Sequence, residues 1–381
     1  MKHMIKKIIF LTGTRADFGK LKPLIDRVNN SPHFECHVFV TGMHMLLRYG
    51  STSGEVRKQK YKNVFFFKNQ GYETSPEKIL VNTINGFTSF VKKIQPDLIV
   101  VLGDRIEQFS GAIVGALNQI LIAHIEGGEI SGSIDESLRH SITKLSHIHF
   151  VSNKQAKKRL SQLGEMRDNI FIIGSPDIEV MRTVSLPSFK HVKDYYSIPF
   201  TRFAILLFHP ITSEIHTLKD QIKQVIDAII DSGDNYIVVY PNSDEGSDLI
   251  LNEFKRLERN PKFRIYPSLR FQYFLCAMKN SMYVIGNSSA GVREAEVYGI
   301  PAIDIGTRQQ NRYQNKDIVH VAPDKTKILN GIKHIKNKKI KSKIHFGDVL
   351  NSSTQFHKIL KTKSLWKTPV QKLFIDLDSH E

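Results

Sequence analysis

Short apolar segments alternate with longer amphipathic segments along most of this chain. In the first half the apolar segments cover residues 7–12, 36–41, 63–67, 98–103, 120–126, 147–152 and 170–174. They are continuous apolar runs, which is typical of strands buried on both faces of a parallel sheet. Segments with helical periodicity separate most of them, so the pattern predicts strand–helix units with right-handed crossovers.

The series of strands restarts after a segment at 183–200 that contains two prolines and has no strong period. Further strands are expected at 203–208, 235–240, 263–267, 282–287 and 301–306. A chain of 381 residues is too long for one ordinary core. We therefore expect an α/β protein with two Rossmann-like, doubly wound domains facing a cleft. The predicted domains are 1–185 and 195–360, with a tail at 361–381 that packs back on the body.

Composition excludes several classes of protein. No apolar run reaches the roughly 20 residues that a membrane span needs, and the basic N-terminus leads into a short strand pattern without a cleavage site. The two cysteines, Cys36 and Cys276, exclude a disulfide framework and a cysteine zinc site. We expect a cytoplasmic protein without membrane insertion.

The net charge of +17 could indicate nucleic acid, an anionic membrane or small anionic substrates as partners. The densest basic run, 325–345, is typical of an exposed helix and its tail. Neither zinc-finger spacing nor an RNA-recognition aromatic motif lies near it. We therefore interpret the excess charge as a lysine-rich surface and expect no nucleic-acid partner.

Seven chemically rich segments each follow a predicted strand. They are residues 12–20, 41–45, 103–105, 124–129, 208–214, 286–295 and 305–312. Ligands of doubly wound sheets bind beyond the carboxyl ends of the strands. The segments therefore predict a binding site at that edge of both sheets.

The segment GNSSAGVREA (286–295) is a candidate phosphate site, because small residues allow close approach and Ser288 and Ser289 add hydroxyl donors. A simple serine N-cap is the alternative. Arg15, Lys20, Arg308 and Arg312 could contact diphosphate oxygens or form ordinary surface ion pairs. Neither a Walker loop nor GxGxxG is present, so no nicotinamide cofactor is expected.

Three carboxylates fall at the ligand edge of the first predicted sheet, namely Asp104, Glu126 and Asp135. Carboxylates in a closing site can act as acid or base, although Asp135 could instead complement the start of a helix. His209, between a strand and a proline, is the more exposed candidate among the histidines. The other histidine spacings match no closed metal site, so no metal is expected.

Nine motifs of this chain, taken together, resemble those of the UDP-N-acetylglucosamine 2-epimerases. They are TGTRADFGKLKPL, VTGMHM, GDR, HIEGGEISGSIDESLRHSITKLSHIH, IIGSPD, FHPIT, PSLRFQYF, GNSSAGVREA and GTRQQNR. The resemblance covers about residues 5–315 and is greatest to the hydrolysing branch of the sialic acid pathway. The non-hydrolysing branch carries a glutamine where this chain has Met43.

The resemblance implies a glycosyltransferase-B-like fold with the nucleotide mostly on the second domain, no cofactor, and a homodimer. It implies that Arg15, Ser288, Ser289 and Gly291 hold the diphosphate, with Lys20 beside it. It further implies that Glu294 binds ribose and Phe274 stacks on uracil. Its implied catalytic residues are Asp104, Glu126, Asp135 and His209.

Such an enzyme would eliminate UDP from UDP-N-acetylglucosamine and hydrate the resulting glycal to N-acetylmannosamine. The two proton transfers and the activated water explain why several acid–base groups are needed. Alternatives remain a UDP-diacetamido-trideoxyhexose as substrate for legionaminic acid, a non-hydrolysing epimerase, and a glycosyltransferase of the same fold.

Overall fold

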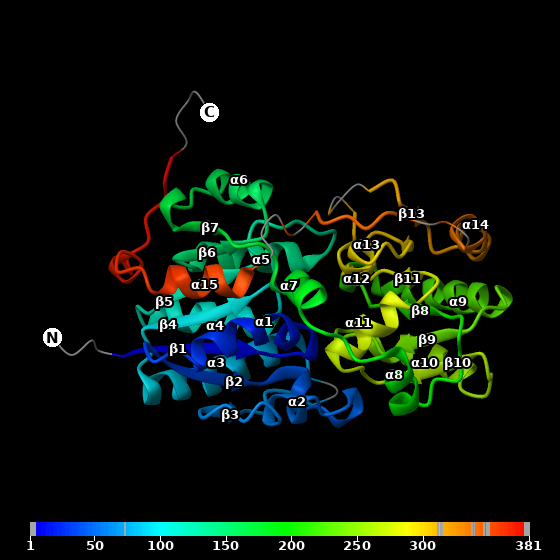
Figure 1. Cartoon of the computed structure of the whole chain (residues 1–381), viewed down its shortest axis with the longest axis horizontal. Coiled ribbons are helices and arrows are strands. Elements are labelled where there is room, and N and C mark those ends of the chain that lie inside the picture. The colour runs from blue at the N-terminus through cyan, green and yellow to red at the C-terminus, as the bar shows by residue number, and fades with distance from the viewer. Residues whose placement is uncertain are drawn as a thin grey trace. The chain divides into compact units, whose positions relative to one another are not determined.

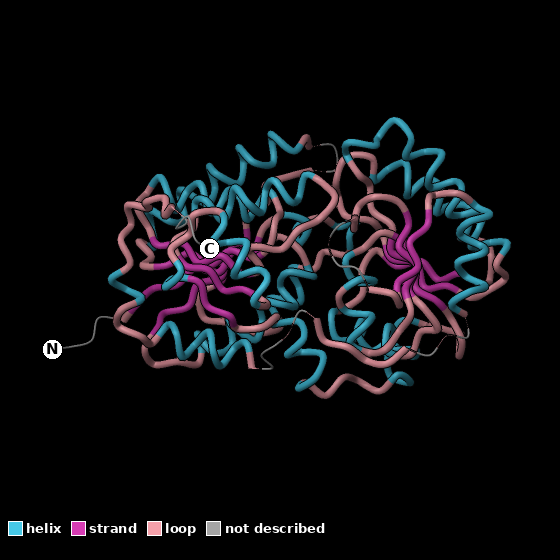
Figure 2. The backbone as a smooth tube through the Cα atoms, turned by 90° about the horizontal axis from the view of Figure 1, so that it is seen from above, coloured by secondary structure: helices cyan, strands magenta, loops and turns pink. Residues whose placement is uncertain are grey.

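The computed structural model describes residues 5–71, 74–310, 312, 315–336, 338, 340–345, 347 and 351–376. The chain divides into two compact units. Unit 1 comprises Met1–Glu129, Asp135–Thr183 and His345–Glu381, and unit 2 comprises Ile130–Ile134 and Val184–Ile344. Each unit has one central sheet with helices on both of its faces (Figure 2).

The sheet of unit 1 has seven strands in the order β3-β2-β1-β4-β5-β6-β7, and all of its pairs are parallel. Its strands are β1 (Lys6–Thr12), β2 (Phe34–Val40), β3 (Val64–Phe66), β4 (Leu98–Leu102), β5 (Leu121–Ile125), β6 (Ile148–Val151) and β7 (Ile170–Ile172). The four central strands β1, β4, β5 and β6 are almost wholly buried, as continuous apolar runs require.

Helices cover both faces of this sheet (Figure 1). The helices on one face are α1 (Arg15–Asn29), α7 (Pro176–Thr183) and α15 (Ser352–Leu360), which contact one another. Those on the other face are α3 (Pro76–Ile94), α4 (Ile106–Leu117) and α5 (Ile134–Leu145). Two further helices are α2 (Ser53–Arg57) and α6 (Lys154–Gln162). Successive residues of β1 alternate between the two apolar clusters, so the sheet separates two cores.

The sheet of unit 2 has six strands in the order β10-β9-β8-β11-β12-β13, again all parallel. Its strands are β8 (Ala204–Leu207), β9 (Tyr236–Val239), β10 (Phe263–Tyr266), β11 (Val284–Gly286), β12 (Ala302–Ile305) and β13 (Ile318–Val321). Its helices are α8 (Phe189–Tyr196), α9 (Ile215–Asp231), α10 (Ser247–Phe254), α11 (Phe271–Lys279), α12 (Ser289–Val292), α13 (Glu294–Val297) and α14 (Lys325–Ile335).

The predicted fold class, two doubly wound parallel sheets, is confirmed, and all twelve expected strands form. One strand, β13, was missed. It is only four residues long and lies at the edge of its sheet, where His320 is exposed. A short edge strand lacks the continuous apolar run by which the other strands were found.

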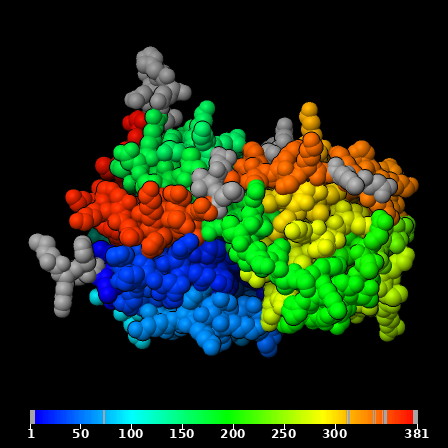
Figure 3. Space-filling model, in the orientation of Figure 1, coloured from blue at the N-terminus to red at the C-terminus, as the bar shows by residue number. Residues whose placement is uncertain are grey.

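Two segments belong to a different unit from the one that the predicted domain boundaries give them. Helix α15, expected in the second domain, belongs to unit 1, where Phe356 and Leu360 are buried in its core. Figure 3 shows the orange-red surface of α15 against the blue surface of α1. The five residues Ile130–Ile134 belong to unit 2, although unit 1 precedes and follows them. Neither segment has an apolar pattern that would reveal its partner.

The placement of α15 gives a stability prediction. Phe356 is fully buried, and its ring centroid lies 4.7 Å from that of Phe150 and 6.2 Å from that of Phe10. Phe356→Ala should lower the free energy of unfolding of unit 1 by about 3–5 kcal/mol, through lost burial and a cavity. Denaturant titration measures this, with Leu117→Ala, at a 79% exposed position, as the control. A loss below about 1 kcal/mol would contradict the placement.

Candidate functional site

The strand order of each sheet reverses at one point, between β1 and β4 in unit 1 and between β8 and β11 in unit 2. Doubly wound sheets bind ligands at this switch point. Arg15 follows β1 and Asp104 follows β4. In unit 2, His209 follows β8 and Ser288 follows β11. Four of the predicted site residues therefore lie at the switch points of their own sheets.

The turn that carries Arg15 is closed by the buried carboxylate of Asp17. Asp17 accepts hydrogen bonds from the backbone N–H of Gly13 at 2.9 Å and of Thr14 at 3.1 Å, and from the Thr12 hydroxyl. Thr14 is the N-cap of α1 and forms a capping box with Asp17. Burial raises the pKa of Asp17 to about 6 despite these bonds. The turn thus holds the half-buried Arg15 at the start of α1.

Glu126 ends β5 in an unusual backbone conformation. Its φ is +65°, a left-handed value that costs energy for a residue with a side chain. The residue is 6% exposed, and its carboxylate accepts hydrogen bonds from Lys20 Nζ at 3.0 and 3.2 Å and from Ser175 Oγ at 3.3 Å. The strained backbone and these bonds together fix the direction of the carboxylate.

Lys20 lies between two carboxylates. Besides Glu126, its Nζ is 3.6 Å from Oδ2 of Asp177, a fully buried residue at the start of α7. The place of Lys20 beside the diphosphate stays a prediction, and within unit 1 its Nζ contacts these two acids. A cation between two buried carboxylates compensates charges that would otherwise be costly to bury.

Asp104 follows Gly103, whose φ is +78°. Its carboxylate forms an ion pair with Arg139 of α5, a side chain that is 1% exposed and also donates to the Glu129 carbonyl at 3.0 Å. The preceding carbonyl, that of Gly103, accepts a hydrogen bond from His124 Nε2 at 2.8 Å. Asp104 is therefore held at both its carboxylate and its backbone.

His124 is a neutral structural residue in this arrangement. A carbonyl can only accept, so Nε2 carries the proton and Nδ1 accepts from the Thr143 hydroxyl at 3.1 Å. Burial lowers the pKa of His124 to about 3. The ring therefore stays neutral at physiological pH.

Asp135 lies in the first turn of α5, one helical turn before Arg139. It is half-buried, and Glu136 follows it in the same turn. The alternative that Asp135 complements the helix dipole stays open beside its predicted catalytic role.

In unit 2, Asn287 links the predicted site residues. Its side chain accepts from the His209 N–H at 2.7 Å and donates to the His209 carbonyl at 2.8 Å. Its carbonyl accepts from Arg308 Nη1 at 3.3 Å. Since Ser288 follows directly, one buried asparagine brings the loops after β8, β11 and β12 together.

The imidazole of His209 accepts a hydrogen bond at Nδ1 from the backbone N–H of Asn242 at 3.0 Å. In the neutral ring the proton must then lie on Nε2. His209 is 9% exposed.

The remaining predicted nucleotide contacts lie on or near short helices of unit 2. Ser288 is the N-cap of α12 and accepts from the Ala290 N–H, as the simple-cap alternative requires. Ser289 and Gly291 belong to α12, and Glu294, 6% exposed, begins α13. Phe274 is partly buried on α11 against the apolar cluster of this unit.

Sequence reasoning missed four residues that hold the candidate site residues in place. They are Asp17, Arg139, Asp177 and Asn287. Asp17 and Asn287 lie inside chemically rich segments that follow a strand, whereas Arg139 and Asp177 lie outside all seven of those segments. The specific contacts of all four could not be predicted, because contacts between separate segments leave no periodic pattern in the sequence.

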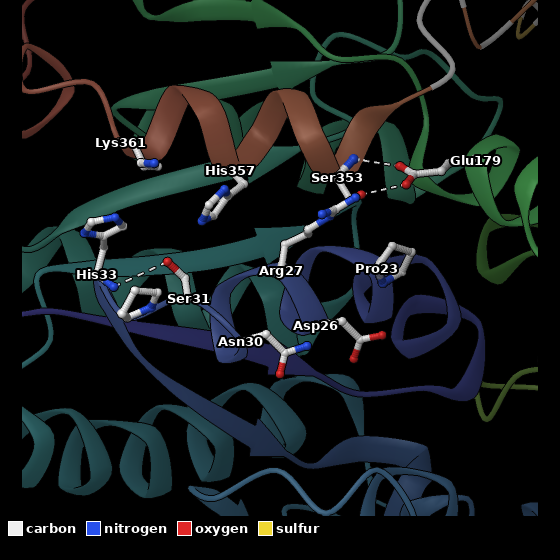
Figure 4. Close-up of a pocket in the computed structure, with 11 residues that line it drawn as sticks. Pro23, Asp26, Arg27, Asn30, Ser31, His33, Glu179, Ser353, His357 and Lys361 are labelled. Carbon is white, nitrogen blue, oxygen red and sulfur yellow. Dashed lines mark hydrogen bonds between the residues drawn. The ribbon is translucent and has the colours of Figure 1, made fainter.

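A surface cavity of about 490 Å³ lies between the C-terminal half of α1 and α15 (Figure 4). None of its lining residues is a predicted site residue. Ser353 donates to the two oxygens of Glu179 at 2.6 Å each, and these bonds tie α15 to α7. The cavity is therefore a feature of helix packing and lies apart from the strand ends.

Two properties of the described residues bear on the expected partners. Among the residues that the structure describes, no group of three or more histidine, cysteine, aspartate or glutamate side chains could hold a metal ion. Within the same residues, every helix is too short or too polar to cross a bilayer.

Comparison with known proteins identifies the relatives of this chain. A relative from Neisseria meningitidis serogroup B, named UDP-N-acetylglucosamine 2-epimerase, is 44% identical over 98% of this chain and 100% of its own length. A Legionella pneumophila protein named UDP-N,N'-diacetylbacillosamine 2-epimerase (hydrolyzing) is 33% identical over 94% of this chain and 96% of its own.

The solved structure of Methanocaldococcus jannaschii UDP-GlcNAc 2-epimerase, in complex with UDP-GlcNAc and UDP, has the same fold. The TM-score is 0.78 at 20% identity, over 93% of this chain and 99% of that one. The family model described as UDP-N-acetylglucosamine 2-epimerase matches residues 26–361. The chain therefore belongs to the UDP-N-acetylglucosamine 2-epimerase family.

Proposed function

We propose that this protein is a hydrolysing 2-epimerase that converts UDP-N-acetylglucosamine and water to N-acetylmannosamine and UDP, for sialic acid biosynthesis. Family membership and the motif resemblance support the reaction class. The observation that carries it is the arrangement of two acids. Asp104 and Glu126 follow the neighbouring strands β4 and β5, and each is held by a cation from another element, Arg139 and Lys20 respectively.

Unit 2 binds the nucleotide in this proposal. The hydroxyls of Ser288 and Ser289, the backbone at Gly291 and the guanidinium of Arg308 contact the diphosphate. Glu294 accepts from the ribose hydroxyls and Phe274 stacks on uracil. The support is that Asn287 ties the loops carrying His209, Ser288 and Arg308 to one another.

Unit 1 supplies the candidate catalytic carboxylates Asp104, Glu126 and Asp135, and unit 2 supplies His209. A carboxylate removes the proton on carbon 2 while the bond between carbon 1 and the glycosidic oxygen breaks, and the electron pair leaves with UDP. Arg15 stabilises the departing diphosphate. Water then adds to the glycal, with its hydroxyl on carbon 1 and a proton on carbon 2 from the opposite face. Lys20 and Arg139 orient Glu126 and Asp104 for these transfers.

A second sugar has specific support. The Legionella pneumophila relative, 33% identical, is named for UDP-N,N'-diacetylbacillosamine. The same acids would serve that substrate, since the chemistry at carbons 1 and 2 is unchanged. Assaying both UDP-sugars in parallel distinguishes the two, and the ratio of kcat/KM decides the substrate.

Proton NMR of the purified protein with UDP-N-acetylglucosamine tests the reaction. We expect free N-acetylmannosamine and UDP, with solvent deuterium at carbon 2 when the reaction runs in heavy water. A UDP-linked product would indicate the non-hydrolysing reaction. Retention of the original hydrogen at carbon 2 would exclude elimination, and an unchanged substrate together with transfer to an added acceptor would indicate a glycosyltransferase.

Removing either candidate acid should abolish most turnover without abolishing nucleotide binding. Asp104→Asn and Glu126→Gln are each expected to lower kcat by at least about 100-fold, because each removes a proton-transfer group. Steady-state kinetics and UDP titration calorimetry measure the two effects separately. The control is Asp168→Asn, an exposed acid before β7, which should have normal kinetics. Near-normal rates in both acid variants would refute their assignment.

Arg15→Ala should raise the barrier by roughly 2–4 kcal/mol, because a cation beside the leaving diphosphate stabilises developing charge. The matched control is Arg27→Ala, which removes an exposed arginine from the last turn of the same helix. The measurement is kcat/KM for both variants. Equal values in Arg15→Ala and wild type would mean that Arg15 does not contact the diphosphate.

A further inference from the structure

The tail segment, residues 370–376, lies against the C-terminal end of α5 and is red in Figure 1. Lys372 Nζ donates to the carbonyls of Thr143 at 2.8 Å and Ser146 at 2.6 Å. These carbonyls lie at and just beyond the end of the helix, where a cation is favoured by both hydrogen bonding and the helix dipole. Ile375 N–H donates to the Gly164 carbonyl at 3.1 Å and fastens the segment further along.

Buried charges hold Lys372 in place. It pairs with Glu165, a 1% exposed carboxylate that also contacts His149 Nε2 and Lys144 Nζ, each at 3.0 Å. Burial raises the pKa of Glu165, but the hydrogen bond from His149 and the charge of Lys372 outweigh it and lower that pKa to about 2. The carboxylate is therefore ionised at physiological pH and pairs with the lysine as an anion.

A histidine anchors the preceding residues. His147 Nδ1 accepts from the Ile122 N–H at 3.1 Å, so Nε2 carries the proton and donates to the Val370 carbonyl at 3.0 Å. The tail segment is thus bound at Val370, Lys372 and Ile375 to three different parts of unit 1. It belongs to the folded body of that unit.

Thr143 connects this anchor to a candidate catalytic acid. Its carbonyl accepts from Lys372, and its hydroxyl donates to His124, which donates in turn to the Gly103 carbonyl. Asp104 is the next residue. Its carboxylate pairs with Arg139, which lies one helical turn before Thr143 in the same helix. Both supports of Asp104 therefore depend on where α5 lies.

We infer that Lys372 is a positioning residue for the epimerase reaction, setting the place of α5 and, through Thr143, His124 and Arg139, the direction of Asp104. The inference rests on the proposed function, because it takes Asp104 as a proton-transfer group. A role confined to stability makes a different prediction, namely loss of folded protein with normal turnover in the molecules that remain folded.

The variant Lys372→Met keeps the length of the side chain and removes its donors. We expect kcat to fall about 10- to 100-fold, as misplacement of a reacting group by about an ångström can do. We expect UDP to bind with unchanged stoichiometry and with a Kd within about twofold of wild type. A mere loss of folded protein would instead lower the stoichiometry of UDP binding. Lys372→Arg, which keeps the charge and donors, should recover most of the rate. The control is Lys367→Met, an exposed lysine of the same tail.

Thr143→Val tests the other half of the connection, because it removes the hydroxyl and keeps the carbonyl. It should lower kcat as well, and the double variant with Lys372→Met should lose less than the sum of the two free-energy changes. Additive effects, or wild-type kcat in Lys372→Met, would overturn the inference. If Lys372→Met does not fold, the rate of Lys372→Arg and of Thr143→Val still decides it.

Hydrogen exchange separates this inference from the proposed function. In Lys372→Met without substrate, the amides of α5 should exchange faster than in wild type, whereas those of α3 should not. If wild type turns over no UDP-sugar but α5 loosens in the variant, the proposed function fails and the link from Lys372 to α5 stands. If α5 exchanges as in wild type, the link itself is wrong.

Discussion

Parallel hydrogen bonding is the constraint on which the candidate site depends. Because every described pair in both sheets is parallel, all strands of a sheet end at the same edge. In unit 1 the register is explicit, since Leu102 lies opposite Ile125. Glu126 follows its strand by one residue and Asp104 by two, so two acids from distant parts of the chain begin side by side. No side-chain contact is needed to bring them there.

Charge compensation then determines how these acids point. Glu126 and Asp177 share Lys20, and Asp104 pairs with Arg139. Burying a carboxylate without such a partner would cost free energy. Removing the carboxylate would in turn leave an uncompensated cation, which is also costly to bury. The excess of positive charge in the whole chain is thus a poor guide to its chemistry. The informative charges are the few that are buried and matched.

The sequence predicts the sheets well, because buried parallel strands are continuous apolar runs and helices have a longer period. It also predicts which loops carry chemistry, since polar segments follow the strands. The sequence does not predict contacts between segments that lie far apart along the chain. The places of α15 and of Ile130–Ile134, and the contact of Lys20 with Glu126, depend on distant segments. The edge strand β13 was not predicted for a local reason, because it is short and partly exposed.

A backbone hydrogen bond attaches the segment Ile130–Ile134 to the rest of unit 2. The Gly132 N–H donates to the Arg308 carbonyl at 3.1 Å, and a side chain on Gly132 would overlap the Thr307 carbonyl. With His345–Glu381 returning to unit 1, neither unit is one uninterrupted stretch of sequence. Recombination between related genes at a single breakpoint between Ile134 and Arg308 would therefore separate this pentapeptide from its partner. A chimera of two related proteins should therefore exchange the pentapeptide together with the loop around Arg308.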